Sequence, residues 1–294
     1  METTLLSLST MHAPTFVLGS LLLKALKEAI PIKYSSQEIF LLFSIVIIIT
    51  IFDIKTTEYY SIITVMAIVG IDKLSLLDYE DKVSVVLFSK ACNFRCPFCH
   101  NGDSVLNAQT ELDFNEILEF LKGRKGLVDA VVFSGGEPTL EPDLEVKIKA
   151  VKSLGFLIKL DTNGTNPELL EKLLDDGVVD YVAMDIKNSP SLYAQTSGVK
   201  SVNIENIKKS ISLLMNKAPD YEFRTTLVKE FHEHMDYDQF LELVKGAKRL
   251  YLQKFVNREG CIIKGLHDVD ELEATKLREY LLSKGLSDVS LRGY

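Results

Sequence analysis

The sequence predicts an α/β domain built round a mostly parallel sheet, and two observations lead to this prediction. Short apolar segments alternate with amphipathic segments from residue 82 onward. Several of the amphipathic segments also begin with residues that cap helices. Strands that alternate with helices form β–α–β units, and such units build parallel sheets. Six units suit either a partial (β/α) barrel or a doubly wound sheet, and in both folds the chemistry lies at the carboxyl ends of the strands.

The predicted strands are short apolar runs, several of them rich in Val, Leu and Phe. A final short strand is expected near Val289–Leu291. The six strands before it are predicted at Lys82–Phe88, Asp129–Phe133, Phe156–Leu160, Asp180–Met184, Tyr221–Val228 and Arg249–Phe255.

The predicted helices lie between these strands. Asp113 and Glu116 have the spacing of a capping box. Asn166 precedes Pro167, which places a capping residue before a proline at the first helical position. The helices are predicted at Phe114–Lys122, Leu144–Leu154, Pro167–Asp175, Ile204–Asn216, Tyr237–Lys245 and Asp270–Lys284.

Composition excludes several classes of protein. The chain has 294 residues with 33 Lys and Arg against 41 Asp and Glu, which gives a formal net charge of −8. No basic run stands out, so nucleic acid is not expected as a partner. Four cysteines in a chain of this length do not form a disulfide scaffold.

The first 65 residues differ from the rest, and we treat residues 1–65 and 66–294 as separate parts. Residues 1–65 contain one Gly, no Arg, no Cys and eleven Ile. Their most apolar run is Ile39–Phe52, which is fourteen residues long. A membrane-spanning helix needs about 20 apolar residues, so this run is short for one. Three interpretations stay open: a membrane anchor, a poorly structured extension, or an upstream stretch from a misassigned start, with Met66 as the true beginning.

The strongest motif is a cysteine triplet after the first long strand. Cys92, Cys96 and Cys99 have the spacing C-x3-C-x2-C within one loop. A closed zinc site would need a fourth ligand; His100 adjoins Cys99 and is badly placed for this, and Cys261 is distant in sequence. Three thiolates on a [4Fe–4S] cluster leave one iron free to bind another molecule. Zinc binding and simple packing of buried cysteines are the alternatives.

This triplet resembles the cluster-binding motif of the radical S-adenosylmethionine superfamily, including the aromatic Phe98 before the last cysteine. The resemblance implies a partial (β/α)6 barrel in which Cys92, Cys96 and Cys99 hold a [4Fe–4S] cluster. It also implies that the open iron chelates S-adenosylmethionine, whose reductive cleavage gives a 5′-deoxyadenosyl radical.

Polar motifs follow the next two strands. Gly135 and Gly136 allow close approach of a ligand and supply N–H groups, and Glu137 can accept from an ammonium. These three resemble the superfamily motif that binds the methionine amino group. After the third strand come Asp161 and Asn163, which could also form an Asx turn.

The fourth and fifth strands also end in charged residues. Asp185 and Lys187 lie two residues apart on one strand face, so a plain ion pair is the alternative to a cofactor contact. Arg224 lies in the fifth strand. We expect all of these residues near the cofactor, because they lie at the end of the sheet where a (β/α) site forms.

Taken in order, the motifs resemble those of glycyl-radical-enzyme activases, in particular the activating protein of the anaerobic ribonucleotide reductase. The resemblance covers Ile68–Tyr294. It departs where Glu80 and Asp81 replace an expected Pro-Gly, and it gives Cys261 no role. A third departure follows the fifth strand, where His232 and His234 lie in a segment that more often reads Pro-Gly. A solvated loop is expected for these histidines, and a position facing the substrate is the alternative. The resemblance implies a glycyl-radical enzyme as protein substrate, a flavodoxin or ferredoxin as electron donor, and an anaerobic cytoplasmic setting, with Ile39–Phe52 as a candidate membrane tether.

Two other functions compete with the activase. One is a small-molecule enzyme similar to 7-carboxy-7-deazaguanine synthase, and a pyruvate formate-lyase activase is a close variant of the first hypothesis. The other is a binding module that only holds zinc or a cluster. A second [4Fe–4S] cluster would need three or four more thiolates and only Cys261 is spare, so branches with auxiliary clusters are disfavoured.

Overall fold

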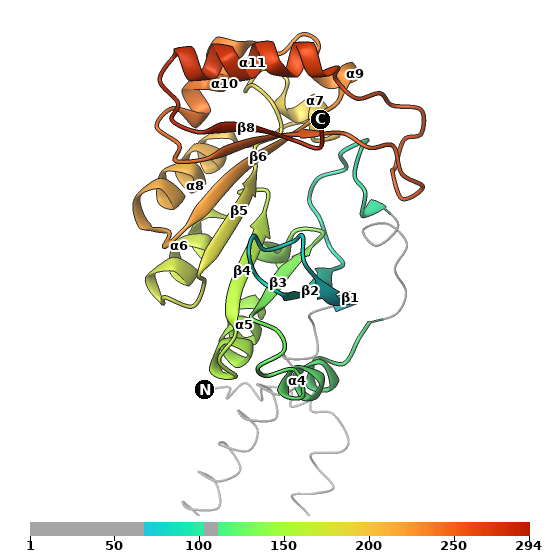
Figure 1. The fold of residues 1–294 in the computed structure, drawn as a ribbon, viewed down its shortest axis with the longest axis vertical. Helices are drawn as coiled ribbons and strands as arrows, with labels where there is room; N and C mark the ends of the chain where they lie inside the picture. The colour runs from blue at the N-terminus through green and yellow to red at the C-terminus, as the bar shows by residue number, and fades with distance from the viewer. Residues whose placement is uncertain (1–67, 103–110) are drawn as a thin grey trace, which may run out of the picture. The chain divides into compact units, whose positions relative to one another are not determined.

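One eight-stranded sheet organises the computed structural model, which describes residues 68–102 and 111–294 (Figure 1). The strands lie side by side in chain order, from β1 to β8. They are β1 (Ile68–Ser75), β2 (Ser84–Ser89), β3 (Ala130–Gly135), β4 (Leu157–Thr162), β5 (Tyr181–Asp185), β6 (Tyr221–Leu227), β7 (Leu250–Lys254) and β8 (Val289–Arg292).

The sheet order decides between the two predicted folds. Strand β1 is antiparallel to β2, and all neighbours from β2 to β8 are parallel. A doubly wound sheet reverses its strand order at a switch point, and this sheet does not. The partial (β/α) barrel is therefore confirmed and the doubly wound alternative is wrong. The antiparallel strand β1 is an addition that the sequence analysis did not predict.

The helices follow the strands in the predicted order. Right-handed crossovers between successive parallel neighbours place the connecting helices on one face of the sheet. Neighbouring helices contact each other along this face: α4 packs on α5, α6 on α8, and α8 and α11 both on α10. The α-helices are α4 (Phe114–Lys122), α5 (Leu144–Ser153), α6 (Pro167–Asp175), α7 (Tyr193–Thr196), α8 (Ile204–Lys217), α9 (Lys229–His232), α10 (Tyr237–Val244) and α11 (Glu271–Ser283).

The predicted helix caps are present. The Asp113 side chain accepts a hydrogen bond from the Asn115 N–H, and the Asn166 side chain accepts one from the Leu169 N–H. Each bond satisfies a backbone donor that the first helical turn leaves without a partner. These local signals explain why α4 and α6 begin where the sequence predicts.

The two faces of the sheet differ in chemistry. Alternate residues that face the helices are apolar and fully buried, such as Phe133, Leu160 and Phe223. The residues between them face the concave side. On this side β2 and β3 carry apolar side chains, and β4 to β6 carry charged ones. These charged residues are Lys159, Asp161, Asp185, Glu222 and Arg224. The concave face therefore carries the polar chemistry.

The turn between β1 and β2 closes the lower part of the concave face. Tyr79 in this turn packs on Tyr181 of β5, with ring centroids 5.3 Å apart. The Lys159 ammonium donates to the Asp78 carbonyl oxygen, and the Tyr251 hydroxyl lies 3.4 Å from the Glu80 carboxylate. The turn thus links the concave side chains of β4, β5 and β7.

The apolar run Ile39–Phe52 and the candidate start Met66 lie outside the described residues, so the predicted division at residue 65 stays a prediction. Within residues 68–102 and 111–294, no helix is both long and apolar enough to cross a membrane.

Asp81 gives a test of the β1–β2 turn. It is the non-glycine residue with a positive φ, +58°, in the described part of the chain. Left-handed backbone costs a residue with a Cβ roughly 1 kcal/mol, and glycine avoids this cost. Asp81→Gly should therefore raise the free energy of unfolding by about 0.5–1 kcal/mol in urea titrations. Glu80→Gly is the control, because it should not stabilise the protein. Equal effects of the two changes would contradict a strained backbone at Asp81.

Candidate active site

The three cysteines line one cavity at the carboxyl ends of the strands, together with the other predicted site residues. Cys92, Cys96 and Cys99 are free thiols in the loop after β2. The structure brings all twelve predicted residues together at this cavity, although their contacts with a cluster or cofactor stay predictions. The other nine are Phe98, Gly135, Gly136, Glu137, Asp161, Asn163, Asp185, Lys187 and Arg224.

The cysteine loop is held from one side by the segments after β4 and β5. The Arg95 N–H donates to the Ser197 carbonyl oxygen over 2.9 Å. The next residue, Gly198, has φ +65°, and a Cβ there would lie 2.0 Å from the Arg95 carbonyl oxygen. Asn93 accepts a hydrogen bond of 2.8 Å from the Asn163 side chain. Backbone approach this close requires glycine at position 198.

From the other side, the segment after β7 closes over the same loop. We call residues 255–268 the clasp. Its Ile263 N–H donates to the Pro97 carbonyl oxygen over 2.8 Å, and His100 Nε2 donates to the Val256 carbonyl oxygen over 2.8 Å. Phe255 of the clasp packs against Phe98, with ring centroids 6.4 Å apart. His100 is thereby turned towards the clasp.

Cys261 belongs to the clasp. Its side chain is buried, and its thiol lies 3.9 Å from the Phe98 carbonyl oxygen. Its neighbour Ile262 lines the cavity, whereas Cys261 is not among the residues that do so. The position of Cys261 behind the cysteine loop is consistent with packing.

Burial sets the chemistry of the three thiols. Burial raises the pKa of Cys92 to about 12 and that of Cys96 to about 11, and it raises the pKa of Cys99 as well. The Lys187 ammonium opposes this shift at all three. The thiols are therefore protonated at neutral pH until a cation displaces the protons, which is the usual coupling between thiolate ligands and metal binding.

These residues fit an iron–sulfur cluster better than a single metal ion. Three free thiols face one cavity, which matches a [4Fe–4S] cluster with one iron left open. In the described ranges, no three His, Cys, Asp or Glu side chains are grouped closely enough to hold one ion. The zinc alternative therefore gains no support from the arrangement of these side chains.

Gly135, the last residue of β3, and Gly136 lie against the backbone that leads into the cysteine loop. A Cβ at Gly136 would lie 2.0 Å from the Ala91 carbonyl oxygen, and a Cβ at Gly135 would lie 2.5 Å from the Ser89 nitrogen. The Gly136 N–H donates to the Ser89 carbonyl oxygen over 2.8 Å. The expectation that Gly136 offers a bare N–H is therefore wrong. The glycines are needed because the backbone before Cys92 passes directly over them.

Glu137 joins the ends of β3 and β4. Its buried carboxylate accepts hydrogen bonds from the Thr162 hydroxyl at 2.7 Å, the Asn163 N–H at 2.6 Å, and the hydroxyl and N–H of Thr139. Burial raises its pKa despite these four bonds. Asn163 forms the Asx turn that the sequence offered as an alternative, because its side-chain oxygen accepts from the Thr165 N–H over 3.0 Å.

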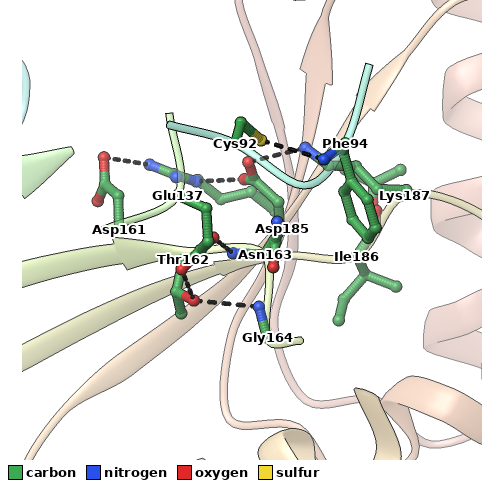
Figure 2. A network of polar contacts seen from close by, with 12 residues as sticks. Cys92, Phe94, Glu137, Asp161, Thr162, Asn163, Gly164, Asp185, Ile186 and Lys187 are labelled. Carbon is green, nitrogen blue, oxygen red and sulfur yellow. Dashed lines mark hydrogen bonds and ion pairs between the residues drawn. The ribbon is translucent and has the colours of Figure 1, made fainter. Parts of the chain in front are cut away.

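Four charged residues of the cavity lining form an ion-pair network, and Figure 2 labels three of them, Asp161, Asp185 and Lys187. Arg224 Nε donates to Asp185 over 2.9 Å, Lys187 Nζ donates to Asp185 over 3.0 Å, and Arg224 Nη1 lies 3.6 Å from Asp161. Burial favours a higher pKa for Asp185, but the charges of Arg224 and Lys187 outweigh it and hold the pKa at about 2. The predicted Asp185–Lys187 ion pair is present. Lys187 and Arg224, which both contact Asp185, line the cavity.

Sequence reasoning missed two residues that support this network. His232 was expected in a solvated loop, but its side chain is buried, so that expectation is wrong. Its Nε2 donates to the Lys187 carbonyl oxygen over 2.9 Å, and its Nδ1 accepts from the Val228 N–H. Asn188, fully buried, donates to the Phe231 carbonyl oxygen and to Thr196. Neither had a local sequence signal, because their partners lie on other segments.

The fold and the site together are those of an α/β protein that places three free thiols at one cavity, where the parallel strands end. Residues 86–244, more than half of the chain, match the family described as the Radical SAM superfamily. The chain therefore belongs to the radical SAM superfamily, whose members use a [4Fe–4S] cluster and S-adenosylmethionine.

Three relatives differ in how much they share with this chain. A protein of Methanocaldococcus jannaschii assigned as a glycyl-radical enzyme activating enzyme is 35% identical over 198 residues, which cover 65% of this chain and 80% of that protein. The pyruvate formate-lyase-activating enzyme of Clostridium pasteurianum is 33% identical over 40% of this chain and 51% of its own length. A protein of Thermococcus kodakarensis assigned as a GTP 3′,8-cyclase is 28% identical over 44% of this chain and 43% of its own length.

Cysteine substitutions test which thiols hold the cluster. Cys92→Ala, Cys96→Ala and Cys99→Ala should each abolish retention of iron and sulfide, because each removes a thiolate that faces the cavity. Cys261→Ala should retain both, because its thiol lies behind the loop. The measurement is iron and sulfide per chain after anaerobic reconstitution. Equal iron in all four variants would sink this assignment.

Gly198 tests the support of the cysteine loop. Gly198→Ala places a Cβ against the Arg95 carbonyl oxygen and should lower iron retention several-fold by displacing the loop. Gly177→Ala is a matched control, because Gly177 has φ +63° with nothing within 4 Å of its hypothetical Cβ. Both changes carry the same backbone strain of roughly 1 kcal/mol. Similar iron loss in both would show that the close approach at Gly198 does not matter.

Proposed function

We propose that the chain is an activase that generates a glycyl radical on a partner enzyme. Cys92, Cys96 and Cys99 would hold a [4Fe–4S] cluster, which would supply the one electron for reductive cleavage of S-adenosylmethionine. Methionine would be one product, and the Cα hydrogen of a partner glycine would leave in the other, 5′-deoxyadenosine. The electron comes from an external donor, for which a flavodoxin or a ferredoxin is proposed.

The observation that carries this proposal is the 35% identity to the Methanocaldococcus jannaschii protein, which extends over 80% of that relative's length. The pyruvate formate-lyase-activating enzyme also matches, but over only about half of its own length. The motifs that support the anaerobic ribonucleotide reductase as the partner follow one another along the chain: the cysteine triplet, GGE (Gly135–Glu137), DTNG (Asp161–Gly164) and DIK (Asp185–Lys187). A pyruvate formate-lyase is the second candidate partner.

The form of the cavity supports a protein substrate. Its floor is closed by the ion-pair network of Asp161, Asp185 and Arg224. Beneath this network, Lys159 and the Tyr79–Tyr181 ring pair fill the concave face. A site that these side chains close from below suits a glycine that a partner presents on an exposed loop. An enzyme for a small molecule needs a deeper polar pocket that surrounds its substrate.

The residues of this chain have distinct roles in the proposal. The three thiolates would hold a [4Fe–4S] cluster and leave one of its irons for S-adenosylmethionine. Lys187 and Arg224 supply the positive charge that the carboxylate of S-adenosylmethionine requires, and Asp185 fixes both side chains. Phe98 and Ile262 give the cavity apolar walls that exclude water from the reaction.

A small-molecule function is the competing proposal. The match to the Thermococcus kodakarensis protein favours it, but that match covers less than half of either chain. An enzyme similar to 7-carboxy-7-deazaguanine synthase is the form that we consider. It requires turnover in the absence of any partner protein, and this requirement separates the two proposals.

The activase proposal predicts a radical on the partner. The full chain is reconstituted with iron and sulfide, reduced anaerobically, and mixed with S-adenosylmethionine and the anaerobic ribonucleotide reductase from the same organism. EPR spectroscopy should show a glycyl-radical doublet on the reductase, with one 5′-deoxyadenosine formed per radical. The reductase with its radical-site glycine changed to alanine is the control and should give no doublet.

Two other outcomes contradict parts of the proposal. If 5′-deoxyadenosine forms without a doublet on the reductase but a pyruvate formate-lyase acquires one, the partner assignment is wrong. If neither partner acquires a radical and 5′-deoxyadenosine forms with a small-molecule substrate, the activase proposal is wrong.

A further inference from the structure

A line of ion pairs runs from the cavity floor to the last strand of the sheet. At one end, Arg224 lines the cavity and contacts Asp161 and Asp185. On its other side, Arg224 Nη1 lies 3.9 Å from Oε1 of Glu222. The second carboxylate oxygen of Glu222, Oε2, lies 3.4 Å from Nη2 of Arg292 on β8. Glu222 therefore stands between two arginines, only one of which faces the cavity.

Glu222 is buried and is not part of the cavity lining. Its side chain is 3% exposed, and the Tyr181 hydroxyl donates to its Oε2 over 2.9 Å. Its Oε1 has no hydrogen-bond partner among the described residues, so the nearby cations balance its charge. A buried carboxylate with a single cation would draw that cation into full contact, because an uncompensated buried charge is costly. Two arginines instead share Glu222, and Arg224 stays beyond hydrogen-bond distance of it.

Arg292 is held in place from the outside. Its guanidinium lies over the Tyr251 ring, 3.7 Å from the centroid. The Tyr251 hydroxyl in turn lies 3.4 Å from the Glu80 carboxylate in the β1–β2 turn. Arg292 lies beyond residues 86–244, which match the superfamily, so this brace comes from outside the matched segment.

We infer that Glu222 is a positioning residue for Arg224 and that Arg292 sets how strongly Glu222 attracts Arg224. Glu222 attracts the Arg224 guanidinium from below, and Arg292 weakens this attraction enough for Arg224 to keep its contacts with Asp161 and Asp185. Arg224 is then held at the cavity in the orientation that meets bound S-adenosylmethionine. This inference rests on the proposed contact between Arg224 and S-adenosylmethionine, and it is independent of which partner is activated.

Glu222→Gln tests the inference. It keeps the size of the side chain and its acceptor for Tyr181, but it removes the charge that both arginines share. Binding of S-adenosylmethionine to the reconstituted, unreduced protein should weaken about tenfold in anaerobic equilibrium dialysis, as expected for one misplaced charged hydrogen bond. Iron content and the absorption spectrum without S-adenosylmethionine should not change. Glu168→Gln on α6 is the matched control, because its partner is the surface residue Lys209, and it should bind S-adenosylmethionine as the unaltered protein does.

A double-mutant cycle separates positioning from a general structural effect. Arg224→Met alone should weaken S-adenosylmethionine binding, and adding Glu222→Gln to it should cause no further loss, because Glu222 acts through Arg224. Additive losses would overturn the inference. An Arg224→Met protein with unchanged affinity would overturn it as well, whereas the glycyl-radical experiment would still test the activase proposal.

Arg292→Met gives a second route if Glu222→Gln does not retain its cluster. Arg292 is 40% exposed on the last strand, so its loss disturbs the core little. Without it, Glu222 should draw Arg224 away from Asp185 and weaken S-adenosylmethionine binding several-fold. This loss should also vanish in the Arg224→Met background. Unchanged affinity in Arg292→Met would overturn the inference.

Discussion

The site depends on close backbone contact between the cysteine loop and glycines from three other segments. Gly136 lies under Ala91, Gly198 lies against Arg95, and Gly260 of the clasp lies against the His100 carbonyl oxygen. At each contact a Cβ would lie at 2.4 Å or less from a carbonyl oxygen of the loop. Backbone atoms cannot move aside as flexible side chains can, so these contacts fix the loop before any cluster binds. The three thiols are consequently held at one cavity by segments that carry no ligand themselves.

The cations of the cavity lining share one carboxylate. The proposed contact with the carboxylate of S-adenosylmethionine requires cations in the cavity lining, but buried cations need carboxylates to offset the loss of solvation. Asp185 meets this need for both Lys187 and Arg224 at 3.0 and 2.9 Å. Because its pKa is about 2, it stays ionised at every physiological pH. The same side chains therefore serve the stability of the sheet and the electrostatics of the cavity.

Most of the fold and the set of residues that line the cavity follow from the sequence, whereas the contacts that these residues make do not. Strand alternation and caps such as Asn166 are local signals, and they predict six helices to within one or two residues, whereas the four-residue helices α7 and α9 were not predicted. Strand β1 has its own turn but no neighbouring helix, so the β–α pattern missed it. The cysteine triplet and Phe98 were found from the spacing of the motif, and the other eight site residues because parallel strands end at one edge. What Glu137, Gly136 and His232 contact depends on partners that are distant along the chain, and no local pattern encodes such pairs.

The clasp has a consequence for how the protein is made. Its contact with the cysteine loop joins His100 to Val256, which are 156 residues apart in the chain. During synthesis the cysteines leave the ribosome long before the clasp and β8 exist, and contacts between such distant segments form late in folding. The three thiols therefore pass through a period in which only the early strands surround them. Ile262 is the lining residue furthest along the chain, so the complete cavity exists only after the clasp has been made.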